Sequence, residues 1–166
     1  MKAVGIFVAA LALAACNLTP VYSGGTRSVA AETLGAISVP AIQGREGYLV
    51  RQALLDRFPQ NGDVRYRVDV RLDDDITGLG IRGDDSITRE RRTLRARWQL
   101  IDTSSGVTLL DETVRRSAGI DVVSSDYAVV AAETDALERL SQEVATEIAT
   151  RVAVFAKEDI AVREGR

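Results

Sequence analysis

The sequence predicts an α+β domain: a four-stranded, mostly antiparallel sheet with two helices packed on one face, in the order β-α-β-β-β-α. Two observations indicate this class. Apolar and polar residues alternate strictly in two segments, as is typical of half-buried strands, and an apolar stripe near the carboxyl end repeats every three or four residues, as in an amphipathic helix. With 46% hydrophobic and 27% charged residues among 166, a single globular domain is expected.

The first strand and the first helix come early in the domain. Leu34 to Ile42 contains three β-branched residues, and Pro40 within it predicts an edge strand or a strand end, because proline cannot donate to a ladder. From Glu46 to Phe58 the apolar residues recur at helical spacing, and Pro59 with the following Asn61-Gly62 ends the element. A short amphipathic helix is therefore expected between two strands.

Three further extended segments predict an antiparallel meander. Val64 to Leu72 places apolar residues on one face and mainly arginines on the other, so one face is expected to be buried and one wet. A connection rich in glycine and aspartate is expected over Asp73 to Asp85, before a second alternating strand from Leu94 to Leu100. In the third run, Val107 to Ser117, the pair Leu109-Leu110 breaks the alternation and leaves its faces unassigned.

The last predicted element is a helix from about Asp126 to Lys157. Ser124 and Ser125 offer side-chain oxygens that can cap its first turn. At about 1.5 Å per residue such a helix is roughly 45 Å long. Its narrow apolar stripe suits packing across a sheet, and a two-chain coiled coil is the alternative use of the same stripe.

Composition excludes several kinds of active site. The chain has no histidine, which removes Ser-His-Asp and Cys-His nucleophiles and histidine metal sites. Its one cysteine, Cys16, cannot form an intramolecular disulfide. The net charge of −3 argues against a nucleic-acid binder. Apart from Lys2 and Lys157, all the basic residues are arginines.

The amino-terminal segment has the features of a lipoprotein signal. The apolar run from Ala3 to Leu13 is shorter than the roughly 20 residues needed to cross a bilayer. Leu13-Ala14-Ala15-Cys16 resembles the bacterial lipobox, which implies a diacylglyceryl thioether on Cys16, cleavage before it and acylation of its new amine. The alternative is an ordinary signal peptide with a chance cysteine. Asn17 after the cysteine is compatible with sorting to an outer membrane.

The chain therefore divides into four segments. We expect a signal peptide at residues 1–15, a lipid-anchored tether at 16–33, the α+β domain at 34–158 and a polar tail at 159–166. Acyl chains, each contributing about 0.8 kcal/mol per buried CH₂, would hold the mature protein at a membrane surface without spanning it.

Arginines on the wet face of the sheet are the candidate binding site. Between Arg82 and Arg97 the local charge is +3, and the planar guanidinium suits phosphate and carboxylate recognition. We predict binding of a phosphorylated lipid head group or of an acidic partner surface by Arg65, Arg67, Arg71, Arg91, Arg95 and Arg97. The alternative is a solvated outer face neutralised by Asp69 and nearby acids.

Neither a cofactor nor catalysis is indicated. Asp73-Asp74-Asp75 faintly resembles a calcium loop, but a strand precedes it and no glutamate closes it, so a solvated turn is favoured. The glycines Gly78, Gly80 and Gly83 do not form a phosphate-binding GxGxxG loop. No pair of carboxylates stands in an apolar setting that would raise a pKa.

The mature chain resembles the lipopolysaccharide-assembly lipoprotein family, LptE, through short motifs in a fixed order over most of its length. In chain order these are the lipobox ending at Cys16, Pro20-Val21-Tyr22, Arg51-Gln52-Ala53-Leu54-Leu55, the Leu94 to Leu100 strand, the Thr103 to Gly106 turn, and Ser124-Ser125-Asp126-Tyr127-Ala128 running into Ala132-Glu133 and the last helix.

The resemblance implies a non-catalytic protein anchored by lipid at the periplasmic leaflet of the outer membrane. Its partners would be the β-barrel that inserts lipopolysaccharide, which it would help to assemble and plug, and lipopolysaccharide itself. Two other classes remain open: an accessory lipoprotein of a periplasmic lipid-transfer ABC system, and a lipid-anchored hydrolase that uses carboxylates.

Overall fold

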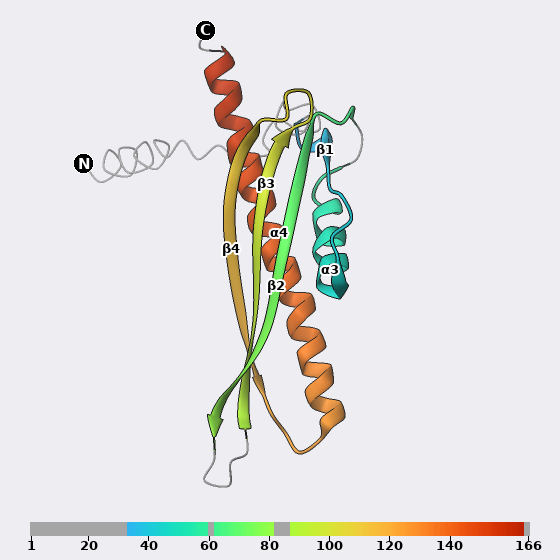
Figure 1. The fold of residues 1–166 in the computed structure, drawn as a ribbon, viewed down its shortest axis with the longest axis vertical. Helices are drawn as coiled ribbons and strands as arrows, with labels where there is room; N and C mark the ends of the chain where they lie inside the picture. The colour runs from blue at the N-terminus through green and yellow to red at the C-terminus, as the bar shows by residue number, and fades with distance from the viewer. Residues whose placement is uncertain (1–32, 60–61, 82–86, 165–166) are drawn as a thin grey trace, which may run out of the picture.

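The computed structural model describes residues 33–59, 62–81 and 87–164 (Figure 1). Its strands are β1 (Ile37–Ser38), β2 (Tyr66–Ile81), β3 (Ile87–Asp102) and β4 (Thr108–Asp121), and its helices are α3 (Gly44–Leu55) and α4 (Asp126–Glu164). The order β-α-β-β-β-α and the α+β class are confirmed. The signal peptide and the tether up to residue 32, Cys16 included, lie outside the described residues.

The four strands form one sheet in the order β1-β2-β3-β4. β1 is parallel to β2, whereas the β2–β3 and β3–β4 pairs are antiparallel. Figure 1 looks onto one face of this sheet, with α4 crossing behind it and α3 beside β2. Both helices therefore cover the same face, as predicted, and the face toward the viewer is left open.

The first strand is much shorter than the expected Leu34 to Ile42 segment. Residues 33–35 are helical, and the pairing with β2 begins only at Ile37 and ends at Ser38. Pro40, which has no N–H to donate, follows shortly after and directs the chain toward α3.

The β2–β3 hairpin is longer than expected. Most of the Asp73 to Asp85 segment, predicted as a connection, belongs to β2, and β3 begins at Ile87. The ladder continues without a break from Tyr66 opposite Asp102 to Leu79 opposite Arg89. The aspartates and glycines of this segment do not by themselves favour a strand. Pairing with β3 therefore stabilises the extended conformation here.

The two helices differ from their predicted limits at one end or both. α3 lies earlier than the expected Glu46 to Phe58, since the Leu54 carbonyl accepts the amides of both Arg57 and Phe58 and tightens the chain into a turn. α4 starts at Asp126, where the Ser125 Oγ accepts the Ala128 amide, as the capping residues predicted. It continues past Lys157 to Glu164, so much of the expected polar tail is helical.

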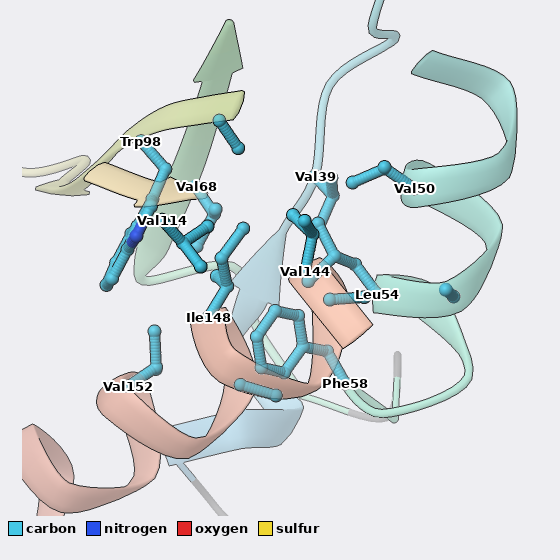
Figure 2. Close-up of a cluster of buried hydrophobic side chains, with 14 of the residues drawn as sticks. Val39, Val50, Leu54, Phe58, Val68, Trp98, Val114, Val144, Ile148 and Val152 are labelled. Carbon is cyan, nitrogen blue, oxygen red and sulfur yellow. The ribbon is translucent and has the colours of Figure 1, made fainter. Parts of the chain in front are cut away.

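The core lies between the covered face of the sheet and the two helices (Figure 2). Trp98 and Val68 from the sheet meet Ile148 and Val152 of α4, while Leu54 of α3 packs into the same cluster. The largest of the nearly fully buried side chains are Ile37, Val50, Leu54, Phe58, Val68, Leu94, Trp98, Leu100, Leu137, Leu140, Val144 and Ile148. Val64, expected on the apolar face, instead precedes β2 and is largely exposed.

Candidate binding face of the sheet

The open face of the sheet carries a cluster of exposed arginines from three neighbouring strands. Because side chains alternate between the two faces of a strand, the odd-numbered residues of β2, β3 and β4 in this region point away from the helices. We name this cluster the arginine face, defined by Arg67, Arg71, Arg91, Arg95, Arg97 and Arg115. Five of the six residues predicted for the site are thus brought together on one surface.

The register sets arginines directly opposite one another. Arg71 of β2 pairs with Arg97 of β3, and Arg95 of β3 pairs with Arg115 of β4. Like charges that face each other across a strand pair destabilise a sheet. The Asp111 carboxylate, which binds Arg97 and also attracts Arg71, offsets part of the repulsion within the first pair.

Two of these arginines are neutralised by acids on the same face. Arg97 donates from Nε and Nη2 to both carboxylate oxygens of Asp111, at 3.1 and 2.9 Å, and Gln99 donates to the same carboxylate at 2.7 Å. These bonds, with the one from Arg97 the strongest, hold the pKa of Asp111 below its usual value. Arg67 Nε lies 2.9 Å from Asp69 Oδ1. The predicted neutralisation by Asp69 is thus seen for Arg67.

The other four arginines keep their charge available. Arg71, Arg91, Arg95 and Arg115 form no ion pair with any residue that the structure describes. Asp73 is the direct strand neighbour of Arg95 but stays beyond ion-pair distance of it. A guanidinium without a carboxylate partner retains its full set of donors for a phosphate or a carboxylate on another molecule.

Arg65 lies apart from this cluster. It precedes β2, and its guanidinium carbon sits 5.4 Å from the centre of the Tyr66 ring, a cation–π contact. Its carbonyl accepts both the amide and the hydroxyl of Thr103 from the β3–β4 turn. Arg65 thus helps to close the end of the sheet, and it is not part of the arginine face.

Arg92 lies on the covered face, where it bonds to Asp74 of β2 and to the backbone of α4. Its Nε donates to Asp74 Oδ1 at 2.9 Å, its Nη2 to the second oxygen, and its Nη1 to the Glu133 carbonyl of α4 at 2.8 Å. The two side chains are only 13% and 16% exposed. The hydrogen bond to Asp74, with further attraction from that carboxylate, raises the pKa of Arg92. This pair ties the long hairpin to the start of α4.

Arg115 was missed from the sequence because β4 contains a bulge. The register shifts between Leu100 and Ile101, which face Leu110 and Thr108, so Leu109 is an extra residue on β4. Both leucines of the irregular pair are consequently half-buried, and the alternation resumes only beyond them. Counting outward from Val114, which is buried, would have placed Arg115 on the open face.

No metal site is built from the described residues. Within them no group of three acidic or cysteine side chains could hold a metal ion. The three aspartates of the calcium-like motif sit in β2, where Asp74 points to the covered face and Asp73 and Asp75 to the open one. Over the same residues, no helix is long and apolar enough to cross a membrane.

Similar folds occur in bacterial lipoproteins. A Caulobacter crescentus lipoprotein is 26% identical, with a TM-score of 0.65 over 79% of this chain and 96% of that one. Two further lipoproteins share the fold at 13% identity. Uncharacterized lipoprotein B from Nitrosomonas europaea has a TM-score of 0.58 over 73% of this chain and 82% of that one. A minor lipoprotein from Acinetobacter baumannii has a TM-score of 0.54 over 71% of this chain and 88% of that one. No curated protein matches this chain in sequence.

The family model described as LptE, lipopolysaccharide-assembly, matches residues 34–152, which is most of the described domain and includes the whole arginine face. The resemblance seen in the short motifs is thereby confirmed, and with it the lipoprotein and lipopolysaccharide-transport character of the chain. The protein belongs to the LptE family, the family of lipopolysaccharide assembly.

Proposed function

We propose that this protein is the lipid-anchored partner of the outer-membrane β-barrel that inserts lipopolysaccharide. The domain would occupy the lumen of the barrel, assist its assembly and contact lipopolysaccharide on its way to the outer leaflet. Acyl chains on Cys16 would hold it at the periplasmic leaflet. The proposal rests on membership of the family together with the uncovered sheet face that carries unpaired arginines.

The charge pattern of the arginine face supports contact with anionic groups inside such a barrel. Arg71, Arg91, Arg95 and Arg115 remain unpaired within the described residues, although the chain as a whole is acidic. The planar guanidinium group can donate two hydrogen bonds at once to a lipid A phosphate or to an acidic side chain on a lumen wall. The face needs no apolar patch for this role, since phosphate recognition is carried by charge-assisted hydrogen bonds.

Purification from membranes tests the proposed partner. The full chain carrying a carboxyl-terminal affinity tag is extracted in mild detergent, and the co-purifying proteins are identified by mass. A large outer-membrane β-barrel in near-equal amount is the expected result. Recovery of an inner-membrane ABC complex instead would favour the accessory lipoprotein of a lipid-transfer system and overturn the proposal.

A matched variant tests the lipid anchor. Cys16→Ala removes the only thiol of the chain, so we expect unprocessed precursor to accumulate and the membrane-bound fraction to fall. Cys16→Ser serves as a second variant of nearly identical size. Normal processing and normal membrane retention of both variants would show that Cys16 is not the anchor.

A further inference from the structure

The outer edge of β2 is left without a strand partner over most of its length. β1 pairs with it only through Ile37 and Ser38, opposite Tyr66 and Arg67. After Ser38 the chain leaves the ladder and runs beside β2 toward α3 (Figure 1). Beyond Arg67, no strand within the described residues borders β2 on this side.

The backbone of Val70 and Leu72 points into this open edge. The Tyr66 amide donates to the Ala36 carbonyl at 3.1 Å, so the even-numbered residues of β2 direct their N–H and C=O groups away from β3. The regular β2–β3 register carries this alternation forward to Val70 and Leu72. Neither residue has a backbone hydrogen bond to a described residue on that side. Unpaired rows of this kind are templates for another strand.

A groove gives access to these groups. Two adjoining hollows, of about 350 Å³ and 630 Å³, both border on Ala41, Ile42, Val70 and Arg71. One wall is the chain that follows β1 and the other is the edge of β2. Ile42 and Val70 give the groove an apolar strip, with both side chains half-buried. Its two walls therefore offer room for an extended chain beside the free edge.

Arg71 is the arginine of the groove that forms no ion pair with a described residue, although the Asp111 carboxylate of β4 attracts it from beyond ion-pair distance. The Asp69 carboxylate at the groove is held by Arg67, and Arg97 is held by Asp111. On the far wall, Glu46 forms no ion pair with a described residue; its carboxylate attracts Arg92, and this is the smallest contribution to the raised pKa of that arginine. Arg71 itself is exposed and forms no ion pair with a described residue. The complementary group is a carboxylate on the incoming chain.

We propose that this groove binds an extended segment of a partner polypeptide, which adds to the sheet beside β2 and sets an acidic side chain against Arg71. Main-chain hydrogen bonds to Val70 and Leu72 would provide affinity, and the acidic residue would provide specificity. A phosphate could engage Arg71, but it would leave the outward carbonyls of Val70 and Leu72 without donors. The inference goes beyond lipopolysaccharide contact and does not depend on it.

Amide hydrogen exchange tests strand addition directly. The probe is a short capped peptide of alternating valine and glutamate, added to the full lipidated protein in detergent micelles. We expect the amides of Val70 and Leu72 to exchange more slowly with the peptide bound. The amide of Arg71 points to β3 in the ladder and should not change. A valine–lysine peptide is the matched control and should not bind.

Charge-reversal variants separate the groove from the rest of the surface. Arg71→Glu should weaken binding of the glutamate peptide about tenfold. Arg139→Glu makes the same change at an exposed arginine of α4, on the other side of the sheet, and should leave binding unchanged. The proposal is overturned if the peptide gives no protection at Val70 and Leu72, if the lysine peptide binds equally, or if both variants lose affinity alike. The proposal is also overturned if, without peptide, exchange at Val70 and Leu72 slows as the protein concentration rises, because the groove would then bind a second copy of this chain.

Discussion

The two faces of the sheet use the same residue type for opposite purposes. On the covered face, Arg92 is nearly buried and meets both oxygens of Asp74 and a carbonyl of α4. On the open face, Arg91 and Arg95 lie close by on the same strand, exposed and without an ion-pair partner among the described residues. The difference shows that arginine content alone does not define a binding surface. Whether an arginine is available to bind a ligand depends on the face of the sheet to which it points.

Removing Trp98 is expected to have the largest effect on stability. Trp98 is 1% exposed at the centre of the covered face, so Trp98→Ala should lower the free energy of unfolding by about 3–5 kcal/mol. Urea unfolding followed by far-ultraviolet circular dichroism measures the change. Arg95→Ala, on the same strand but the open face, should change it by less than about 0.5 kcal/mol. An equal loss of unfolding free energy in the two variants would contradict the assignment of Trp98 to the buried face and Arg95 to the exposed face.

Breaking the buried ion pair should cost somewhat less. Asp74→Ala leaves the Arg92 guanidinium without its carboxylate in a site that is 13% exposed, and we expect a loss of about 2–3 kcal/mol. The double variant Asp74→Leu with Arg92→Met removes both charges and should recover most of that loss. If Asp74→Ala unfolds at the same urea concentration as the original protein, the pair has no structural role.

The exposed pair on the open face predicts a small and pH-dependent effect. Hydrogen bonds from Arg97 and Gln99 hold the pKa of Asp111 below its usual value, near 3.9 in unfolded chains. Its contribution to stability is therefore present above about pH 4 and is lost as the pH falls through the folded-state pKa. Arg97→Gln should raise the pKa of Asp111 toward its usual value, as followed by an NMR titration of the carboxyl carbon. An unchanged pKa would contradict the paired geometry.

The sequence predicted the parts of the fold that follow a regular period. Alternation from Val64 to Leu72 and from Leu94 to Leu100 located two strands and their faces, and the stripe after Asp126 located the last helix. The long hairpin was missed because its strand form depends on cross-strand neighbours such as Arg92 opposite Ile76, and these are remote in sequence.

The candidate site was predicted in part for the same reason. Arg67, Arg71, Arg91, Arg95 and Arg97 share a face because each stands at an odd position of a regular strand. Arg115 was missed because the bulge at Leu109 hides the period of β4, and the free edge of β2 could not be inferred because it depends on where β1 stops pairing.

Binding to purified lipopolysaccharide and to the co-purified barrel tests the role of the open face most directly. The double variant Arg91→Glu with Arg95→Glu reverses two unpaired charges there, and Arg139→Glu makes the same change at an exposed position of α4, on the other side of the sheet. We expect the face variant to lose about tenfold or more in affinity for at least one of the two ligands, with unfolding unchanged and the α4 variant unaffected. Equal affinity of all three proteins for both ligands would remove the arginine face from the mechanism.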